Sequence, residues 1–403
     1  MQDFEKVFDL TLAAALSKFR QRSSSAGTEL CNTADMTGRV LSADISTDRE
    51  LPPFNRVAMD GYACRKGDLY QPLCIKGSIA AGDPPGLSLE PGTCIRVMTG
   101  AVLPSGADTV VMAESTEIDE DGRMLFKGTE AEKMITNFSS RGEDIQKNTV
   151  VLEKGTILHA KHSALLSSIG YSAVPVFTLP RVGIISTGNE VLEVDSHPES
   201  HQIRNANAAQ IRSQLSGLHI VPSSYGIAPD ELEALKNTIS RASADNDLVL
   251  MSGGVSMGDY DLVPQAMNAN GFNILYDRVA VKPGKPTTFA TSEGCDLFGL
   301  PGNPVSCFVI FELLVKPYIY QFMGAFYHPP ELTAPMAESF QRSKKQRDEW
   351  IPVKLRPDST LIPVTYHGSG HYLAIARADG MVLIPKGVSL LEKGTSVALR
   401  LFQ

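Results

Sequence analysis

The sequence lacks a surplus of positive charge and any clustering of cysteines, and each absence excludes a class of protein. Its net charge is −8 over 403 residues, so no basic excess is present to neutralise a nucleic-acid backbone. The six cysteines are scattered, with no Cys-x-x-Cys pair and no histidines grouped with them. This spacing disfavours a zinc site and a disulfide framework, and it favours reduced thiols in the cytosol.

Long apolar runs and several well-known catalytic motifs are also lacking. No apolar run approaches the ~20 residues that a membrane span needs, and the start Met-Gln-Asp-Phe-Glu-Lys does not resemble a secretory leader. We therefore expect a cytoplasmic protein whose partners include neither membranes nor nucleic acids. The absence of G-x-G-x-x-G, of a Walker loop and of a nucleophile elbow disfavours hydride and acyl chemistry.

The spacing of apolar and turn residues changes several times along the chain. The chain length predicts roughly two to four domains. Helical spacing of apolar residues covers 3–19, and residues 52–144 show short apolar runs between Gly/Pro turns, which is typical of a β-rich module. A second helix is predicted at 162–169. If it pairs with the first helix, the β-rich module is an insertion. Residues 332–403 return to short alternating runs and predict a small β-barrel or sandwich.

Between these parts, strands alternate with helices, which predicts a parallel sheet with right-handed crossovers. The predicted strands are 182–186, 220–225, 248–251, 272–280, 287–290 and 296–300. The predicted helices are 205–215, 230–242 with Asp230 as its cap, 262–267 and 305–322. In such sheets ligands bind at the carboxyl ends of the strands, so the loops 186–190, 252–261 and 300–304 are candidates for one site.

The loop after the strand 248–251 begins Ser252-Gly253-Gly254. Glycines at the end of a strand leave backbone N–H groups uncovered, as at sites that hold phosphates, and Ser252 and Ser256 add hydroxyl donors. Asp261 suits a metal ion that bridges carboxylate and phosphate. A plain glycine turn, with Asp261 as an ordinary helix cap, explains the same residues.

The sequence Lys282-Pro283-Gly284-Lys285-Pro286 is the best cationic cluster. Two ammonium groups stiffened by flanking prolines would bind a dianion, each charged hydrogen bond contributing on the order of 1.5–3 kcal/mol. A charged hairpin is the alternative interpretation. Glycine loops, two lysines and the carboxylates of Glu190 and Asp261 together indicate a phosphoanhydride with a divalent cation.

Seven short motifs occur in the order found in one family. They are MDGYA at 59–63, RVMTGA at 96–101, RGED at 141–144, STGNE at 186–190, SGGVS at 252–256, KPGKP at 282–286 and LPGNP at 300–304. In this the chain resembles the MoeA family, the molybdopterin molybdenumtransferases, which are related to the E domain of gephyrin. The likeness covers nearly the whole chain.

The resemblance implies a multidomain α/β plus β fold and an elongated homodimer. It divides the chain into a helical and linker domain (1–44 and 145–179), an inserted β-rich domain (45–144), a MogA-like α/β domain with a parallel-rich sheet (180–327) and a C-terminal β-barrel (328–403). The implied reaction is the Mg²⁺-dependent insertion of molybdate into adenylylated molybdopterin, with release of AMP. Molybdopterin adenylyltransferase and other proteins of cofactor biosynthesis are implied partners.

The same resemblance implies roles for individual residues. The implied catalytic residues are Asp60, Asp144, Glu190, Asp261, Lys282 and Lys285, of which Glu190 and Asp261 are the metal ligands. The implied substrate contacts are Thr99, Asp230, Ser252, Gly253, Gly254, Ser256, Pro301, Gly302, Asn303, Pro304 and Ser306, with Arg347 and Ser369 added from the C-terminal domain. Asp60, Thr99 and Asp144 are expected to complete the cleft of the other subunit.

Two departures from the family and two rival functions are also apparent. Asn189 stands where the family usually has Asp, and Ser139 and Ser140 stand where arginines are common, so weaker binding of metal and phosphate is expected.

One rival function is that of a molybdopterin adenylyltransferase, which has a similar fold and glycine loop. The other is a non-catalytic, gephyrin-like scaffold, against which the two lysines and four carboxylates argue.

Overall fold

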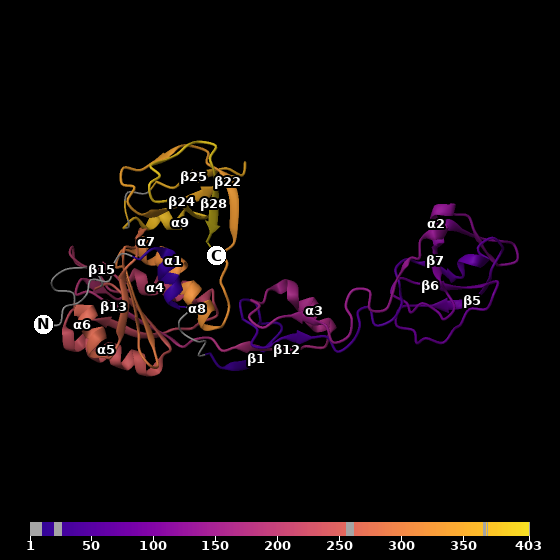
Figure 1. Cartoon of the computed structure of the whole chain (residues 1–403), viewed down its shortest axis with the longest axis horizontal. Coiled ribbons are helices and arrows are strands. Elements are labelled where there is room, and N and C mark those ends of the chain that lie inside the picture. Colours follow the sequence, from indigo (N-terminus) through magenta and orange to yellow (C-terminus); the bar gives the residue numbers. More distant parts are fainter. Residues whose placement is uncertain (1–9, 20–25, 255–261, 366–367, 369, 403) are drawn as a thin grey trace. The chain divides into compact units, whose positions relative to one another are not determined.

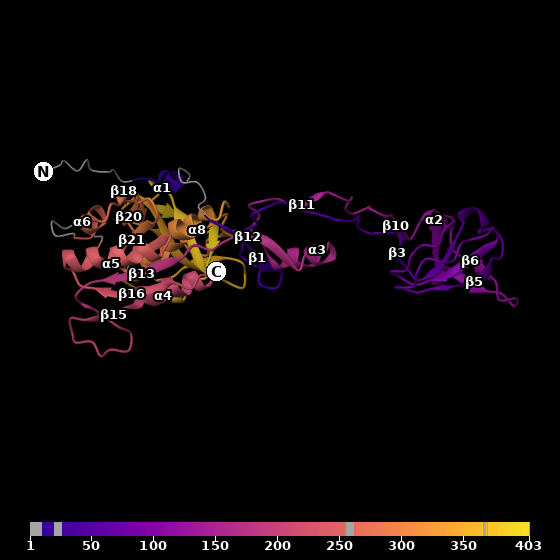
Figure 2. The ribbon, with the colours of Figure 1, turned by 90° about the horizontal axis from the view of Figure 1, so that it is seen from below.

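The computed structural model describes residues 10–19, 26–254, 262–365, 368 and 370–402 (Figures 1 and 2). Contacts group the chain into two compact units. The first unit comprises Met1–Ser42, Gly155–Ala160 and Ala173–Gln403, and the second comprises Ala43–Lys154 and Lys161–Ser172. In the sequence, the second unit is therefore inserted into the first. The finer division into four domains stays a prediction.

The first unit contains an α/β part followed by a β part. Its helices are α1 (Leu12–Phe19), α4 (Ala206–Ser216), α5 (Leu232–Asp245), α6 (Leu262–Ala269), α7 (Pro304–Ile310), η4 (Phe311–Val315), α8 (Lys316–Phe322) and α9 (Tyr372–Ala376). Its strands up to the end of the α/β part are β1 (Thr28–Asn32), β12 (Ala173–Phe177), β13 (Val182–Thr187), β14 (Val191–Leu192), β15 (Ile203–Arg204), β16 (Ser223–Ala228), β17 (Leu248–Ser252), β18 (Asn273–Arg278), β19 (Val281–Lys282), β20 (Pro286–Thr291) and β21 (Asp296–Leu300).

A six-stranded sheet with the order β16-β13-β17-β21-β20-β18 forms the centre of the α/β part. The first four strands are parallel, β20 runs antiparallel to β21, and β18 runs antiparallel to β20 and so in the direction of the first four. Every residue of β13, β17 and β21 is buried, as expected for strands covered on both faces. The predicted parallel-rich sheet is confirmed, although the strand predicted at 220–225 begins three residues later.

Helices cover both faces of this sheet because alternate residues of each strand point to opposite sides. On one face, residues such as Ile185 and Val249 pack with Leu235 of α5 and Val263 of α6. On the other face, Ile184 and its neighbours pack with α4, α7 and α8 (Figure 1). The two apolar clusters make a three-layer α/β/α core.

The helix α1 packs against this core. The ring of Phe19 lies 5.0 Å from that of Phe289 and 5.3 Å from that of Tyr318, both edge to face. The predicted second helix is α3 (Ser163–Ser168), which falls in the second unit. The apolar face of α1 packs against the α/β sheet and α8, and a shared helical domain with 162–169 stays a prediction.

The segment Pro304–Phe322 forms one helix of 19 residues from α7, η4 and α8. By length and composition it could cross a membrane, which our expectation from apolar runs overlooked. However, 78% of its most apolar stretch is buried inside the unit, as in the core helix of a globular protein. A buried ion pair between Glu312 and Lys316 lies in its middle, with 3.2 Å between Nζ and Oε2.

The C-terminal part contains the strands β22 (Glu331–Pro335), β23 (Phe340–Gln341), β24 (Asp348–Leu355), β25 (Leu361–Pro363), β26 (Gly380–Ile384), β27 (Leu390–Leu391) and β28 (Ser396–Leu401). Its main sheet has the order β19-β24-β26-β28-β22, with β25 added beside β24. Among the described residues this sheet stays open, so the predicted barrel is not seen. The edge next to β24 is instead taken by β19, which comes from the α/β part.

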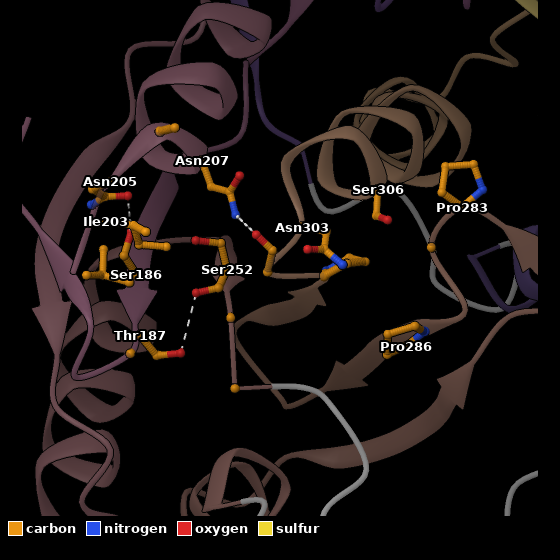
Figure 3. Close-up of a pocket in the computed structure, with 18 of the residues that line it drawn as sticks. Ser186, Thr187, Ile203, Asn205, Asn207, Ser252, Pro283, Pro286, Asn303 and Ser306 are labelled. Atoms are coloured by element: carbon orange, nitrogen blue, oxygen red, sulfur yellow. Dashed lines mark hydrogen bonds between the residues drawn. The ribbon is translucent and has the colours of Figure 1, made fainter. Parts of the chain in front are cut away.

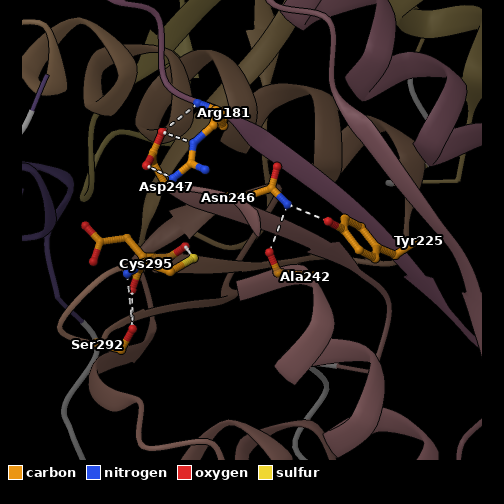
Figure 4. A network of polar contacts seen from close by, with 8 residues as sticks. Arg181, Tyr225, Ala242, Asn246, Asp247, Ser292 and Cys295 are labelled. Atoms are coloured by element: carbon orange, nitrogen blue, oxygen red, sulfur yellow. Dashed lines mark hydrogen bonds and ion pairs between the residues drawn. The ribbon is translucent and has the colours of Figure 1, made fainter. Parts of the chain in front are cut away.

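At the amino end of the central sheet, Arg181 and Asp247 join two strands just before they begin (Figure 4). Asp247 accepts three hydrogen bonds from Arg181: one from its backbone N–H at 2.8 Å and two from its guanidinium at 3.2 and 2.8 Å. Burial acts to raise the pKa of Asp247, but the contacts with Arg181 outweigh it and lower that pKa. The pair therefore lies at the opposite end of these strands from the loops predicted to bind ligand.

The second unit is β-rich, as predicted. It contains β2 (Ile45–Ser46), β3 (Arg56–Val57), β4 (Gly61–Cys64), η1 (Lys66–Asp68), β5 (Cys74–Ile79), β6 (Thr93–Val97), β7 (Thr109–Met112), η2 (Ala113–Ser115), β8 (Thr116–Ile118), β9 (Met124–Phe126), α2 (Glu130–Met134), β10 (Phe138–Ser139), β11 (Val150–Leu152) and α3. Its main sheet has the order β5-β6-β4-β7. Ala63 and Val110 face one apolar cluster, while Tyr62 and Val111 face another.

Gly61 is the tightest point in this sheet. A Cβ atom there would lie 1.9 Å from the backbone oxygen of Val111, and the backbone between two paired strands has little freedom to shift. We predict that Gly61→Ala destabilises the second unit by about 3 kcal/mol. Gly67→Ala is the matched control, because its Cβ meets nothing within 4 Å, and it should cost no more than about 0.5 kcal/mol. Denaturant unfolding of both variants tests this, and equal stability would contradict it.

Candidate functional site

A cavity of about 740 Å³ opens at the carboxyl ends of β13, β17 and β21 (Figure 3). It is lined by Ser186, Thr187, Gly188, Glu190, Val191, Ile203, Arg204, Asn205, Ala206, Asn207, Asp230, Ser252, Gly253, Gly254, Lys282, Pro283, Gly284, Lys285, Pro286, Pro301, Gly302, Asn303, Ser306, Arg347, Gly368 and Tyr372. The described parts of the three strand-end loops predicted to form one site therefore do meet, together with the two-lysine segment.

Asparagine side chains at the start of α4 hold these loops in place. Asn205 accepts a hydrogen bond from the hydroxyl of Ser186 at 3.0 Å and caps α4 by accepting from the N–H of Ala208. Asn207 donates to the backbone oxygen of Gly302 at 2.8 Å (Figure 3). Sequence reasoning missed both asparagines, although asparagine just before a predicted helix is a recognised cap signal.

The turn after β17 requires glycine. Gly253 and Gly254 have φ angles of +90° and +62°, which side chains disfavour. A Cβ on Gly253 would lie 2.7 Å from the backbone oxygen of Thr187, and one on Gly254 would lie 2.7 Å from Val263. The two glycines therefore let the backbone turn closely against β13 and α6 at the cavity wall.

Cationic groups line the opposite wall. Lys282, Lys285 and Arg347 all border the cavity, and the hydroxyl-bearing Ser306 lies near the start of α7. Gly284 has a φ of +114°, and a Cβ there would meet Ile310 at 2.4 Å, so the turn between the lysines packs directly on α7. Both predicted lysines lie in the loop that joins β18 to β20, which makes the hairpin and the anion-binding interpretations compatible.

The ammonium group of Lys282 is held by Glu349 of β24, with 2.6 Å between Nζ and Oε1. Glu349 in turn accepts from Arg342 at 3.2 Å. Neither Glu349 nor Arg342 was expected from the sequence, and both lie in the C-terminal part. The cationic wall is therefore built jointly by the α/β part and the open C-terminal sheet.

Two carboxylates, Glu190 and Asp230, also border the cavity. Asp230 was expected to cap the helix that follows, but Glu231 occupies the cap position of α5. The side chain of Asp230 instead accepts from the N–H of Asn189 at 3.3 Å, and the side-chain oxygen of Asn189 accepts from the N–H of Asp230 at 3.1 Å. This reciprocal pair ties the loop after β13 to the loop after β16.

Several predicted residues fall elsewhere. Asp261, Ser256 and Ser369 lie outside the described residues. Pro304 begins α7, one residue before the predicted start, at the first helical position where proline is common, and Asn303 takes the cap position without a side-chain cap hydrogen bond. Within the described part of the chain, no group of three or more His, Cys, Asp or Glu side chains could by itself hold a metal ion.

Asp60, Thr99 and Asp144 belong to the second unit. Asp60 Oδ1 accepts from both the backbone N–H and the hydroxyl of Thr99, each at 2.7 Å. The hydrogen bond from the backbone of Thr99 and then that from its hydroxyl lower the pKa of Asp60, which keeps this exposed carboxylate ionised. The backbone N–H of Asp144 donates to Leu51 at 3.0 Å. The structure thus pairs Asp60 with Thr99, while their roles stay predictions.

Family models match almost the entire chain. The model described as the MoeA N-terminal region (domain I and II) matches residues 10–170. A probable molybdopterin binding domain matches residues 183–321, and the MoeA C-terminal region (domain IV) matches residues 333–402. The cavity lining falls within the last two matches.

Full-length relatives agree with these models. A molybdopterin molybdenumtransferase of Staphylococcus epidermidis is 33% identical over 404 residues, which cover 98% of this chain and 96% of the relative. One from Haemophilus influenzae is 32% identical and covers 98% of both chains. The crystal structure of a molybdopterin biosynthesis moeA protein from Pyrococcus horikoshii OT3 matches with a TM-score of 0.83 and 29% identity, covering 98% of this chain and 100% of that one. The chain therefore belongs to the MoeA family.

Proposed function

We propose that this protein is a molybdopterin molybdenumtransferase, which inserts molybdate into adenylylated molybdopterin and releases AMP during molybdenum-cofactor biosynthesis. The observation that carries the proposal is the cavity, which combines a wall of cations with strand-end turns in a chain whose full-length relatives bear this name. Both an oxyanion and a phosphoanhydride need such donors. The volume of about 740 Å³ suits a ligand of several rings and phosphates.

In this proposal the two walls of the cavity bind different parts of the substrates. Lys282, Lys285 and Arg347 attract molybdate, and the hydroxyl of Ser306 can donate to it. The N–H of Gly253 already donates to the backbone oxygen of Leu300 at 3.2 Å. The N–H of Gly254, together with the start of α7, would hold phosphate oxygens, because N–H groups at strand ends and helix starts favour anions. Both walls come from a rigid core, so the reacting groups are held close without reorganisation.

The donor chemistry also fits Mg²⁺, whose presence the family resemblance implies. Mg²⁺ is usually bound by one or two carboxylates together with substrate phosphates and water, and Glu190 and Asp230 border the cavity. Glu190 and Asp261 would hold the ion, which would neutralise charge on the phosphoanhydride. The chain's own cations would act on the molybdate independently of that ion.

The proposal extends to the assembly. We include in it the homodimer that the resemblance implies, a cytoplasmic location and catalytic roles for Asp60, Thr99 and Asp144. The ionised state of Asp60, maintained by Thr99, supports a role as an acceptor or a ligand rather than as a proton donor.

A direct assay separates this function from its rivals. The purified protein is incubated with adenylylated molybdopterin, molybdate and Mg²⁺, and we expect release of AMP that depends on molybdate. An adenylyltransferase would instead incorporate labelled AMP from ATP into molybdopterin, and a scaffold would do neither. Either of the latter results would overturn the proposal.

Removing one cation should weaken the use of molybdate. We predict that Lys282→Ala raises the molybdate concentration for half-maximal AMP release by about tenfold or more, since a charged hydrogen bond contributes about 1.5–3 kcal/mol. Lys236→Ala is the matched control, because Lys236 also forms a lysine–glutamate pair, with Glu233 at 2.8 Å on α5, and does not border the cavity. An equal molybdate requirement in both variants would contradict the role of Lys282.

The turn at Gly253 gives a second test. Gly253→Ala introduces a Cβ both at positive φ and 2.7 Å from a backbone oxygen, so we expect AMP release to fall at least about tenfold as the anion-binding turn is displaced. Gly271→Ala also stands at positive φ (+77°) but meets nothing within 4 Å. It should lower stability by about 1 kcal/mol and leave AMP release unchanged. Similar activity of both variants would refute this assignment.

A further inference from the structure

The carboxylate of Glu349 is buried behind the cationic wall of the cavity. Its side chain is 3% exposed, whereas that of its partner Lys282 is 40% exposed. In this ion pair, Glu349 is therefore buried in the protein, whereas Lys282 is partly exposed at the cavity. Because an ammonium group carries three N–H donors, Lys282 can bind Glu349 and still donate towards a ligand.

Strand pairing explains why these two residues meet. β19 and β24 run parallel, with Val281 opposite Asp348 and Lys282 opposite Glu349. Residues directly opposite in a ladder point to the same face, so their side chains are neighbours. The position of Lys282 is therefore set by a strand of the C-terminal sheet as well as by its own rigid loop.

Arg342 fixes the other oxygen of this carboxylate. Its guanidinium donates to Glu349 at 3.2 Å and to the backbone oxygens of Val388, Arg347 and Pro385 at 2.7, 2.9 and 2.7 Å. With its side chain 4% exposed, Arg342 is an immobile counter-charge. Glu349 is thereby paired on both oxygens, which is what a buried charge requires.

The contacts of Arg342, Glu349, Lys282 and Arg347 form one connected network behind the cationic wall. Arg347, whose backbone oxygen binds Arg342, donates through its own guanidinium to the backbone oxygen of Val281 at 3.2 Å. Val281 is the residue before Lys282. Two of the cavity's cations, Lys282 and Arg347, are thus oriented by one network that Glu349 and Arg342 complete.

We propose that Glu349 is a positioning residue for the oxyanion: it holds the ammonium group of Lys282 at the cavity wall, and Arg342 holds Glu349. This inference rests on the proposed function. Removing the carboxylate has two opposite effects, because it leaves the wall more positive but frees the long lysine chain. We expect the loss of position to outweigh the gain in charge, because a freed lysine chain must be ordered again when the oxyanion binds, so binding weakens.

A double-mutant cycle tests this with molybdate itself as the probe. Binding of molybdate to full-length wild type, Glu349→Gln, Lys282→Ala and the double variant is measured by titration calorimetry, and thermal stability is measured alongside. We expect Glu349→Gln to weaken binding by about tenfold, the range in which partners behind a ligand-binding group act, while AMP release at saturating molybdate is retained. In the Lys282→Ala background the same change should have no further effect.

Two further variants serve as a control and as a conservative substitution. Asp348→Asn removes a neighbouring carboxylate of β24 whose partner is the N–H of Lys386, and it should leave molybdate binding unchanged. Glu349→Asp keeps the charge but shortens its reach, so an intermediate loss is expected. Glu349→Asp also tests the proposal if Glu349→Gln fails to fold.

The possible outcomes are distinct. Wild-type affinity in a folded Glu349→Gln or Glu349→Asp variant would overturn the positioning role, as would an equal loss with and without Lys282, because that pattern marks a general structural effect. A wild-type protein that neither binds molybdate nor releases AMP would overturn the proposed function itself. Loss of affinity that disappears in the Lys282→Ala background supports the proposal.

Discussion

The register of three buried parallel strands is the constraint on which the site depends. Ser186 of β13 lies opposite Ser252 of β17, and Ser252 lies opposite Leu300 of β21. Their loops therefore leave the sheet side by side. Because the strands are buried throughout and covered on both faces, slipping by one residue would turn every side chain towards the wrong layer. The same burial that stabilises the core thus aligns the strand-end loops that line the cavity.

The two lysines are placed at the carboxyl end of the central sheet by other strands. The antiparallel pair β18 and β20 projects the two lysines past the end of the sheet, and β19 then leaves the α/β part to join the C-terminal sheet. Glu349 of that second sheet supplies a buried counter-charge to Lys282, and Arg342 in turn pairs with Glu349. A flexible, solvated lysine would bind an anion weakly because its ordering costs entropy. In the proposed function, the contact with Glu349 at 2.6 Å would lower this cost before the substrate arrives.

Much of the α/β fold and of the candidate site could be predicted from local sequence patterns. The apolar run at 248–251 and the strand at 296–300 were placed almost residue for residue, since both are buried strands bounded by turns. The glycine turn and the lysine pair were recognised because Gly253 and Gly284 carry steric requirements visible in sequence. The meeting of the three loops followed from the rule for parallel sheets.

What could not be predicted depends on long-range pairing. Glu349 has no local signature, because its neighbour Lys282 is distant in the chain and only the β19–β24 ladder brings them together. The cap at Asp230 was wrong because tertiary contact with Asn189 competes with local capping. The expected barrel is not confirmed among the described residues, since alternating runs specify strands but not whether a sheet closes. Helix α1 packs on the α/β core through aromatic contacts that its own periodicity does not identify.

The interleaving of the two units affects the order in which the protein can fold during synthesis. The second unit is complete once residue 172 has left the ribosome, whereas Phe19 must wait for Phe289, Phe298 and Tyr318 before its aromatic cluster can form. The inserted unit is thus available to fold first, while the apolar face of α1 stays uncovered. Nascent chains of this protein therefore expose a hydrophobic N-terminal segment until translation of the α/β part is nearly finished.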